Sequence, residues 1–244
     1  MPRYPAMLVL MLFACGAQAR DSSCNVESDY DLSINDRSVI LTRDSGTPKW
    51  IVIRQDRLFV DDRWVQLGPE DRRRIAAFDQ GARAVMPLAS AIGRDAAEIA
   101  FTALGEVAAG FSDDPASTRA RLAKARQQID ARLARSVSPT RFNGDALGEG
   151  IGEVVGEVLP TLIGDIVGGA VRAALTGDTS RLQAMEGLDQ KIEAQVEPRA
   201  RNLEKHADQL CLRMLALDEL DNSLAYRLAD GSRLNMLDAT RGTK

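Results

Sequence analysis

The residues whose type and spacing stand out lie in a repeat of glycine, acidic and apolar residues. The stretch GDALGEGIGEVVGEVLPTLIGDIVGGAVRAAL, residues 144–175, repeats every four positions. On a helix, residues four apart lie on one face and drift by about 40° per step, because 3.6 residues make a turn. We therefore expect a shallow glycine groove beside a row of acids and rows of apolar side chains. The groove consists of Gly144, Gly148, Gly152, Gly156, Gly164 and Gly168.

The sequence leaves two interpretations of this groove open. Each glycine costs roughly 1 kcal/mol relative to alanine in a helix, so close packing must offset the cost. In one interpretation the groove is a small-xxx-small surface for self-association or for insertion at a membrane. In the other, which we favour, a helix of the same chain fills it, and the small residues of a predicted helix over 88–111 provide the matching column. The second interpretation predicts that Gly152→Leu destabilises the protein. Acids along the repeat are expected to exclude a conventional membrane span.

Sequence signatures of common enzyme classes are absent. The chain has no G-x-S-x-G elbow, no P-loop, no Cys-x-x-Cys pair and no histidine cluster. Its single histidine, His206, lies between apolar positions and is expected at the boundary of a helix face. Acids on an amphipathic helix are more typical of a solvated face than of a general acid and base. We predict a non-enzymatic protein without a metal or another cofactor, and the sequence does not identify a small-molecule ligand.

The first residues predict export. An early positive charge at Arg3, an apolar run and the small-x-small pattern Ala17-Gln18-Ala19 are typical of a secretory signal peptide over residues 1–19. A competing interpretation is a lipobox, LFACG, in which Cys15 would be acylated and would anchor the protein to the envelope. We favour plain cleavage after Ala19. Both interpretations predict an exported protein, and plain cleavage predicts a periplasmic one.

Two cysteines remain after this cleavage, Cys24 and Cys211. In an oxidising compartment an even pair indicates a disulfide bond. The alternative, a metal-binding or catalytic thiol, lacks partners within ligand spacing.

The order of sequence patterns predicts an α+β fold. Residues 20–67 contain four β-rich runs separated by short polar turns, which indicates a small antiparallel β-meander. A helical region follows over 68–143, starting at Gly68-Pro69 and interrupted at Pro87. The glycine-repeat helix is expected over 144–178. The remaining segment, 179–244, has coiled-coil-like spacing, a proline at 198 expected to bend or divide it, and a polar tail expected to fray. The body is thus mainly helical, with long amphipathic helices.

The predicted helix over 115–137 is strongly basic and complements the acidic row of the glycine repeat. We interpret the two as solvated faces that attract one another, and the alternative is a basic patch for lipid headgroups. The formal net charge of −4 and the lack of interleaved aromatic residues exclude a nucleic-acid partner. Another envelope protein or a second copy is expected as partner, with a membrane surface as the alternative.

Several of these features occur together in a known family. A cysteine close to the mature start, a D-x-x-I-N segment at 31–35, the meander RLFVDDRWVQL followed by LGPEDRRR, a long helical body and a late cysteine make up this layout. It resembles the YggN-like family of uncharacterised exported bacterial proteins. The resemblance implies a periplasmic location and a Cys24–Cys211 bridge, and it implies no activity. The glycine repeat is a departure from the family pattern.

Overall fold

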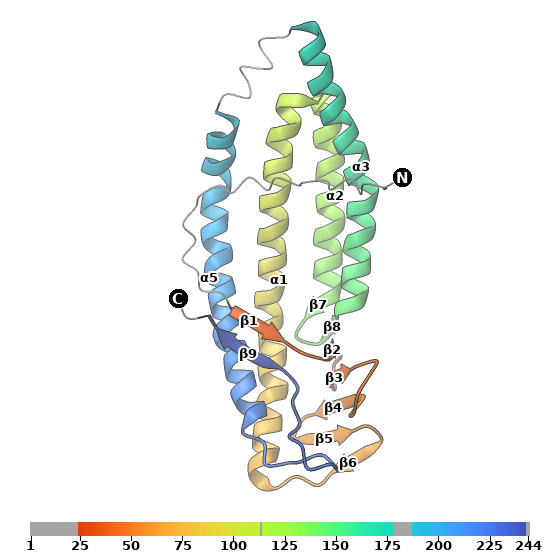
Figure 1. Cartoon of the computed structure of the whole chain (residues 1–244), viewed down its shortest axis with the longest axis vertical. Coiled ribbons are helices and arrows are strands. Elements are labelled where there is room, and N and C mark those ends of the chain that lie inside the picture. Colours follow the sequence, from red (N-terminus) through yellow and green to blue (C-terminus); the bar gives the residue numbers. More distant parts are fainter. Residues whose placement is uncertain (1–23, 113, 178–186, 243–244) are drawn as a thin grey trace, which may run out of the picture.

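A computed structural model describes residues 24–112, 114–177 and 187–242 of the chain (Figure 1). Four long helices extend from a small β-sheet at one end of the molecule. The helices are α1 (Pro69–Phe111), α2 (Pro115–Ser136), α3 (Gly144–Thr176) and α5 (Leu188–Asn222). The strands are β1 (Cys24–Glu27), β2 (Asp31–Ile34), β3 (Val39–Thr42), β4 (Trp50–Arg54), β5 (Arg57–Val60), β6 (Arg63–Val65), β7 (Val137–Ser138), β8 (Arg141–Asn143) and β9 (Asp238–Arg241).

The larger sheet has seven antiparallel strands in the order β6-β5-β4-β3-β2-β8-β7. The predicted meander is therefore confirmed, and β2 extends it. The hairpin of β7 and β8 also joins the sheet, although it lies within the region 68–143 that was expected to be helical. This hairpin connects α2 to α3, so the sheet fixes where both helices start or end.

The core lies between the sheet and α1. Alternate residues of the meander point inward, as the period of two in a strand requires. The most deeply buried apolar side chains on the two sides of this interface are Val39, Ile51, Ile53, Leu58 and Ile75. Burial of a side chain of this size contributes about 1.5–3 kcal/mol, so the sheet end holds much of the stabilising apolar contact.

α1 is one helix from Pro69 to Phe111, and the predicted break at Pro87 is wrong. A proline inside a helix removes one backbone hydrogen bond and strains the preceding turn. Here Val85 and Met86 beside it are buried in the core, and the Arg213 guanidinium of α5 donates to the Ala84 carbonyl at 3.3 Å. Packing on both sides thus carries the helix through the proline. α5 likewise continues through Pro198, so the predicted division there is also wrong.

Glycines of α1 allow its neighbours to approach closely. A Cβ added at Gly81 would lie 2.7 Å from Cδ2 of Leu217 in α5, and one added at Gly93 would lie 3.0 Å from Cδ2 of Leu133 in α2. The small-residue column of α1 therefore seats α2. The sequence predicted that this column would pack against the glycine row of α3, and that prediction is wrong.

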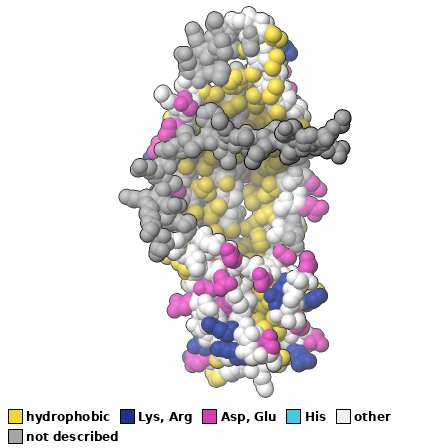
Figure 2. Space-filling model, viewed as in Figure 1, with side chains coloured by type: hydrophobic (Ala, Val, Ile, Leu, Met, Phe, Trp, Pro, Cys, Tyr) yellow, Lys and Arg dark blue, Asp and Glu magenta, His cyan; other side chains and the backbone are white. Residues whose placement is uncertain are grey.

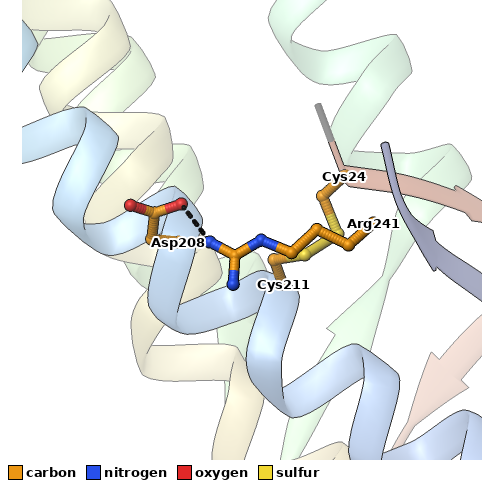
Figure 3. The surroundings of a disulfide bond; sticks show 4 residues. All are labelled: Cys24, Asp208, Cys211 and Arg241. Atoms are coloured by element: carbon orange, nitrogen blue, oxygen red, sulfur yellow. Dashed lines mark hydrogen bonds and ion pairs between the residues drawn. A yellow bond between two sulfur atoms is a disulfide. The ribbon is translucent and has the colours of Figure 1, made fainter. Parts of the chain in front are cut away.

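The end of the chain is tied into the fold, and the expected fraying of the polar tail is wrong for residues 238–241. This segment forms β9, which pairs with β1. The predicted Cys24–Cys211 disulfide links β1 to α5, with a Cα–Cα distance of 5.8 Å (Figure 3). Beside it, Arg241 of β9 forms an ion pair with Asp208 of α5 at 3.4 Å. Strand pairing, a covalent bond and an ion pair hold the two ends of the described chain together.

Two buried carboxylates organise the irregular segment between α5 and β9. Asp71 at the start of α1 accepts hydrogen bonds from the backbone N–H groups of Ala225 and Tyr226. Asp221 near the end of α5 accepts from the N–H groups of Met236 at 2.7 Å and Leu237 at 3.4 Å. A buried N–H without an acceptor is costly, so these side chains determine where the segment lies. α5 ends at Asn222, just before this segment.

Candidate functional site

α3 forms over nearly the whole glycine repeat. The Asn143 side chain caps its first turn by accepting from the Ala146 N–H at 2.8 Å, and Gly177 ends the helix in the left-handed conformation. The helix continues through Pro160. Residue 178, the last of the predicted range, lies outside the described residues.

The buried side of α3 is the row at positions 150, 154, 158, 162 and 166, each two residues after a position of the four-residue glycine spacing. Val154 and Leu162 of this row are buried, and Val158 and Ile166 pack against α1 and α2. Gly150 belongs to the same row. A Cβ there would lie 2.5 Å from Nη1 and 2.8 Å from Cδ of Arg132 in α2. The glycine of α3 that allows close contact with another helix is therefore one outside the predicted groove.

The glycine row itself is open. A Cβ added at any of its five interior members would meet nothing within 4 Å, and these members are Gly148, Gly152, Gly156, Gly164 and Gly168. At Gly144 an added Cβ would reach only the Phe142 ring at 3.8 Å, an ordinary contact. Within the described chain no helix fills the groove, so the interpretation that we favoured from the sequence is wrong. The physical reason is that α2 packs against the row at 150, 154, 158 and 162 instead.

A row of large apolar side chains lies exposed next to these glycines. It consists of Val155, Leu159, Ile163, Val167, Val171 and Leu175, with exposed fractions from 38% to 82%. Figure 2 shows hydrophobic side chains gathered over the upper half of the molecule, whereas charged side chains gather over the sheet end. We call the exposed apolar row together with the five open glycines the α3 face. An uncovered apolar surface of this kind marks an interaction site more often than isolated exposed residues do.

Two acids of the glycine repeat form ion pairs with α2. Glu153 pairs with Arg132 at 2.7 Å, and Asp165 pairs with Arg121. The predicted attraction between the acidic row and the basic helix is confirmed for these two pairs. Arg126 of α2 pairs instead with Glu98 of α1. The basic residues of α2 thus attach it to both neighbouring helices.

By length and composition α3 also qualifies as a membrane span. Within Ala146–Ala173, an 18-residue window has a mean hydropathy of 1.6, and 17% of that window is buried within the protein. This test by length and composition tolerates up to two charged residues in the window, so the expectation that the acids exclude a span stays a prediction.

The other residues singled out from the sequence lie away from the α3 face. His206 of α5 contacts Asp95 of α1, with 2.8 Å between Nδ1 and Oδ2, and so connects these two helices. Cys24 and Cys211 form the disulfide near β9. Among residues 24–112, 114–177 and 187–242, no group of three or more His, Cys, Asp or Glu side chains is arranged to hold a metal ion.

Comparison with known proteins assigns the chain to a family. A model described as "Protein of unknown function (DUF2884)" matches residues 24–237, and the chain belongs to this family. The matched range contains both cysteines of the disulfide and all four described helices. No curated protein and no solved structure matches the chain.

Proposed function

We propose that this member of the DUF2884 family is a non-enzymatic exported envelope protein that associates with a second copy of itself through the α3 face. The observation that carries the proposal is the continuous row of exposed apolar side chains beside five glycines that contact nothing. The face extends for about 40 Å along α3, given a rise of 1.5 Å per residue. Covering it would recover the cost of placing glycines in a helix.

The spacing of the glycines favours a second copy over an unrelated partner. Gly156 and Gly164 lie symmetrically about Pro160, and so do Gly152 and Gly168. An antiparallel pair of α3 helices with a twofold axis near Pro160 would therefore place glycine opposite glycine along the contact. Twofold interfaces require such a self-complementary surface. Close approach of the two backbones would then let the flanking apolar rows pack around the axis.

The composition of α3 favours a protein partner over a membrane surface. Helices that lie on membranes carry Lys and Arg beside large apolar or aromatic residues. Beside the open glycines of α3 lie Glu149 and Glu157, which anionic lipids would repel, and glycines offer no side chain for insertion. The second candidate is nevertheless a peripheral membrane protein or lipoprotein, supported by the hydropathy of Ala146–Ala173. In that case acylated Cys15 would supply the anchor.

The periplasmic location is part of the proposal. Its support is the signal-peptide pattern of residues 1–19, which lie outside the described residues, together with the disulfide, a bond typical of oxidising compartments. The resemblance to YggN-like exported proteins is likewise part of the proposal. Osmotic shock separates the two candidates, because it releases a soluble periplasmic protein and leaves an anchored one in the membrane fraction after a salt wash.

Sedimentation of the mature protein, residues 20–244, tests self-association. We expect a concentration-dependent dimer that Gly156→Leu converts to a folded monomer, because leucine would hold the two backbones apart. Gly105→Leu is the matched control, since Gly105 is a helical glycine of α1 that also contacts nothing. A wild-type protein that remains a monomer at all concentrations, or a dimer that both variants leave intact, would contradict the proposal.

A further inference from the structure

The outer face of the seven-stranded sheet carries aromatic and apolar side chains. One cross-strand row runs through Ser33, Ile40, Val52, Phe59 and Trp64, which face one another in register. Trp50, on the same side of β4, and Trp64 are the only tryptophans of the chain, and their exposed fractions are 56% and 49%. This face lies opposite the side that packs on α1, so it is independent of the α3 face.

A polar cavity of about 520 Å³ opens beside this row, where the β4–β5 hairpin turns and where α1 contributes Asp79 and Arg83. Four arginines and two aspartates line it together with Gln55 and Phe59, and the charged members are Arg37, Arg54, Arg57, Arg83, Asp36 and Asp79. Arg54 and Arg57 stand directly opposite each other across the hairpin. Like charges in such a cross-strand pair are destabilising. A bound anion would compensate the two positive charges.

The arginines differ in how far the protein itself satisfies them. Arg83 is held in place by Asp79 at 3.3 Å and by the carbonyls of Asn35 and Pro139 at 2.7 and 3.0 Å. Arg57 stacks on Trp64, with its guanidinium carbon 5.1 Å from the ring centroid. Neither Arg37 nor Arg54 has a carboxylate or carbonyl partner for its guanidinium in the described part of the chain.

We propose that this cavity binds a ligand bearing a phosphate group. Arginine presents paired N–H donors that match the oxygens of phosphate, and the solvent-exposed guanidinium groups of Arg37 and Arg54 line a common cavity with their donors free to bind a ligand in place of water. Asp79 is already neutralised by Arg83, which leaves Asp36 as the remaining acid against three arginines. Phe59 at the cavity wall, with Trp64 packed edge-to-face against it at 5.0 Å between ring centroids, provides an apolar surface for the part of the ligand attached to the phosphate.

The native tryptophans provide the assay. In a Trp50→Phe variant Trp64 is the only indole, and its emission reports on the Arg57 that stacks on it. The probes are glycerol phosphate and vesicles containing phosphatidylglycerol, each titrated at ionic strength matched with sodium chloride. We expect a saturable change in emission. Response to glycerol phosphate would indicate a soluble phosphate ester, and response to the vesicles alone would indicate a lipid headgroup.

The variants locate the site. Arg37→Gln combined with Arg54→Gln is expected to weaken binding at least about tenfold, the change that corresponds to loss of one charge-assisted contact. Arg63→Gln on β6 is the matched control, because Arg63 does not line the cavity and its substitution should leave the affinity unchanged. Thermal melting confirms that each variant is folded. Absence of a saturable response to both probes, or equal affinity in the double variant, would overturn the proposal.

Discussion

The two ends of the molecule use similar residues in opposite ways. At the sheet end, glycines of α1 bring helices together and the inward apolar side chains are buried. Along α3, five glycines contact nothing and six large apolar side chains are exposed. The sheet end is further secured by the disulfide and by buried carboxylates that hold the segment before β9. The difference teaches that the sheet end holds much of the buried core and of the covalent and polar links, whereas α3 leaves an apolar surface exposed, through which we propose that the protein self-associates.

Removal of the disulfide should have the largest effect on stability. Cys24 and Cys211 are 187 residues apart, so their bond restricts nearly the whole unfolded chain. We expect Cys24→Ser combined with Cys211→Ser to lower the free energy of unfolding by about 2–5 kcal/mol. Urea denaturation under non-reducing conditions measures this loss. An unchanged unfolding midpoint would show that the sheet end does not depend on its covalent link.

The next effect concerns the buried Asp221. Burial raises the pKa of its carboxyl from 3.8 to about 6, although the N–H groups of Met236 and Leu237 act in the opposite direction. The folded protein therefore holds a proton that the unfolded chain releases between roughly pH 4 and pH 6. Stability from this group is fully present below about pH 4 and is lost as the pH rises through about 6. The loss is on the order of 3 kcal/mol, since one pKa unit corresponds to about 1.4 kcal/mol.

Asp221→Asn removes this titration. Relative to the wild type, we expect the free energy of unfolding of the variant to increase by about 3 kcal/mol between pH 4 and pH 7. Urea unfolding at both pH values measures the difference, and Glu204→Gln, which alters an exposed acid of the same helix, serves as control. If the free energies of unfolding of the variant and the wild type differ by the same amount at both pH values, the pKa of Asp221 is not raised in the folded protein.

Gly81→Ala tests the close packing of α1 directly. The new methyl group would lie 2.7 Å from Cδ2 of the buried Leu217, so the Leu217 side chain must change its packing or α5 must shift. Overpacking of this kind costs about 1–3 kcal/mol. Gly105→Ala in the same helix meets open space and should not destabilise. Equal melting temperatures of the two variants would contradict the prediction that Gly81 is closely packed and Gly105 is open.

Gly152→Ala should have the smallest effect, with the opposite sign. Because the position is open, a better helix former is expected to stabilise the monomer by up to about 1 kcal/mol. This reverses the destabilisation that the sequence interpretation predicted for substitution at Gly152. Thermal unfolding at low protein concentration, where monomers dominate, measures the gain. A lower melting temperature of Gly152→Ala under these conditions would support the interpretation that a helix of the same chain fills the groove.

The contrast also explains how far the sequence predicts the structure. Strands such as 50–54 alternate between one buried and one exposed side, so their pattern identified the meander. In α3 the row at 147, 151 and 155 and the row at 150, 154 and 158 are both mainly apolar, so periodicity did not reveal which row is buried. Packing against α1 and α2 buries the second row.

Contacts between distant residues were equally invisible to sequence reasoning. The hydrogen bonds of Asp71 and Asp221 to the segment before β9 depend on tertiary structure, and acids at helix ends gave no signal for them. The helix through Pro87 is a further example, because burial of its neighbours outweighs a local preference. The two cysteines, in contrast, were paired correctly because few alternatives existed.

Disulfide cross-linking in native cells tests the central claim, that α3 faces a second copy. With the proposed cleavage after Ala19, Cys24 and Cys211 are the remaining native cysteines, and because they are bonded to each other a single introduced thiol reports on its own surroundings. Leu159→Cys places that thiol next to Pro160, near the proposed axis, and Trp50→Cys places it at an exposed apolar site on the sheet. After thiols are blocked, the account predicts a disulfide-linked dimer for Leu159→Cys and a monomer for Trp50→Cys on a non-reducing gel. A monomer for Leu159→Cys, or equal dimer in both variants, would contradict it.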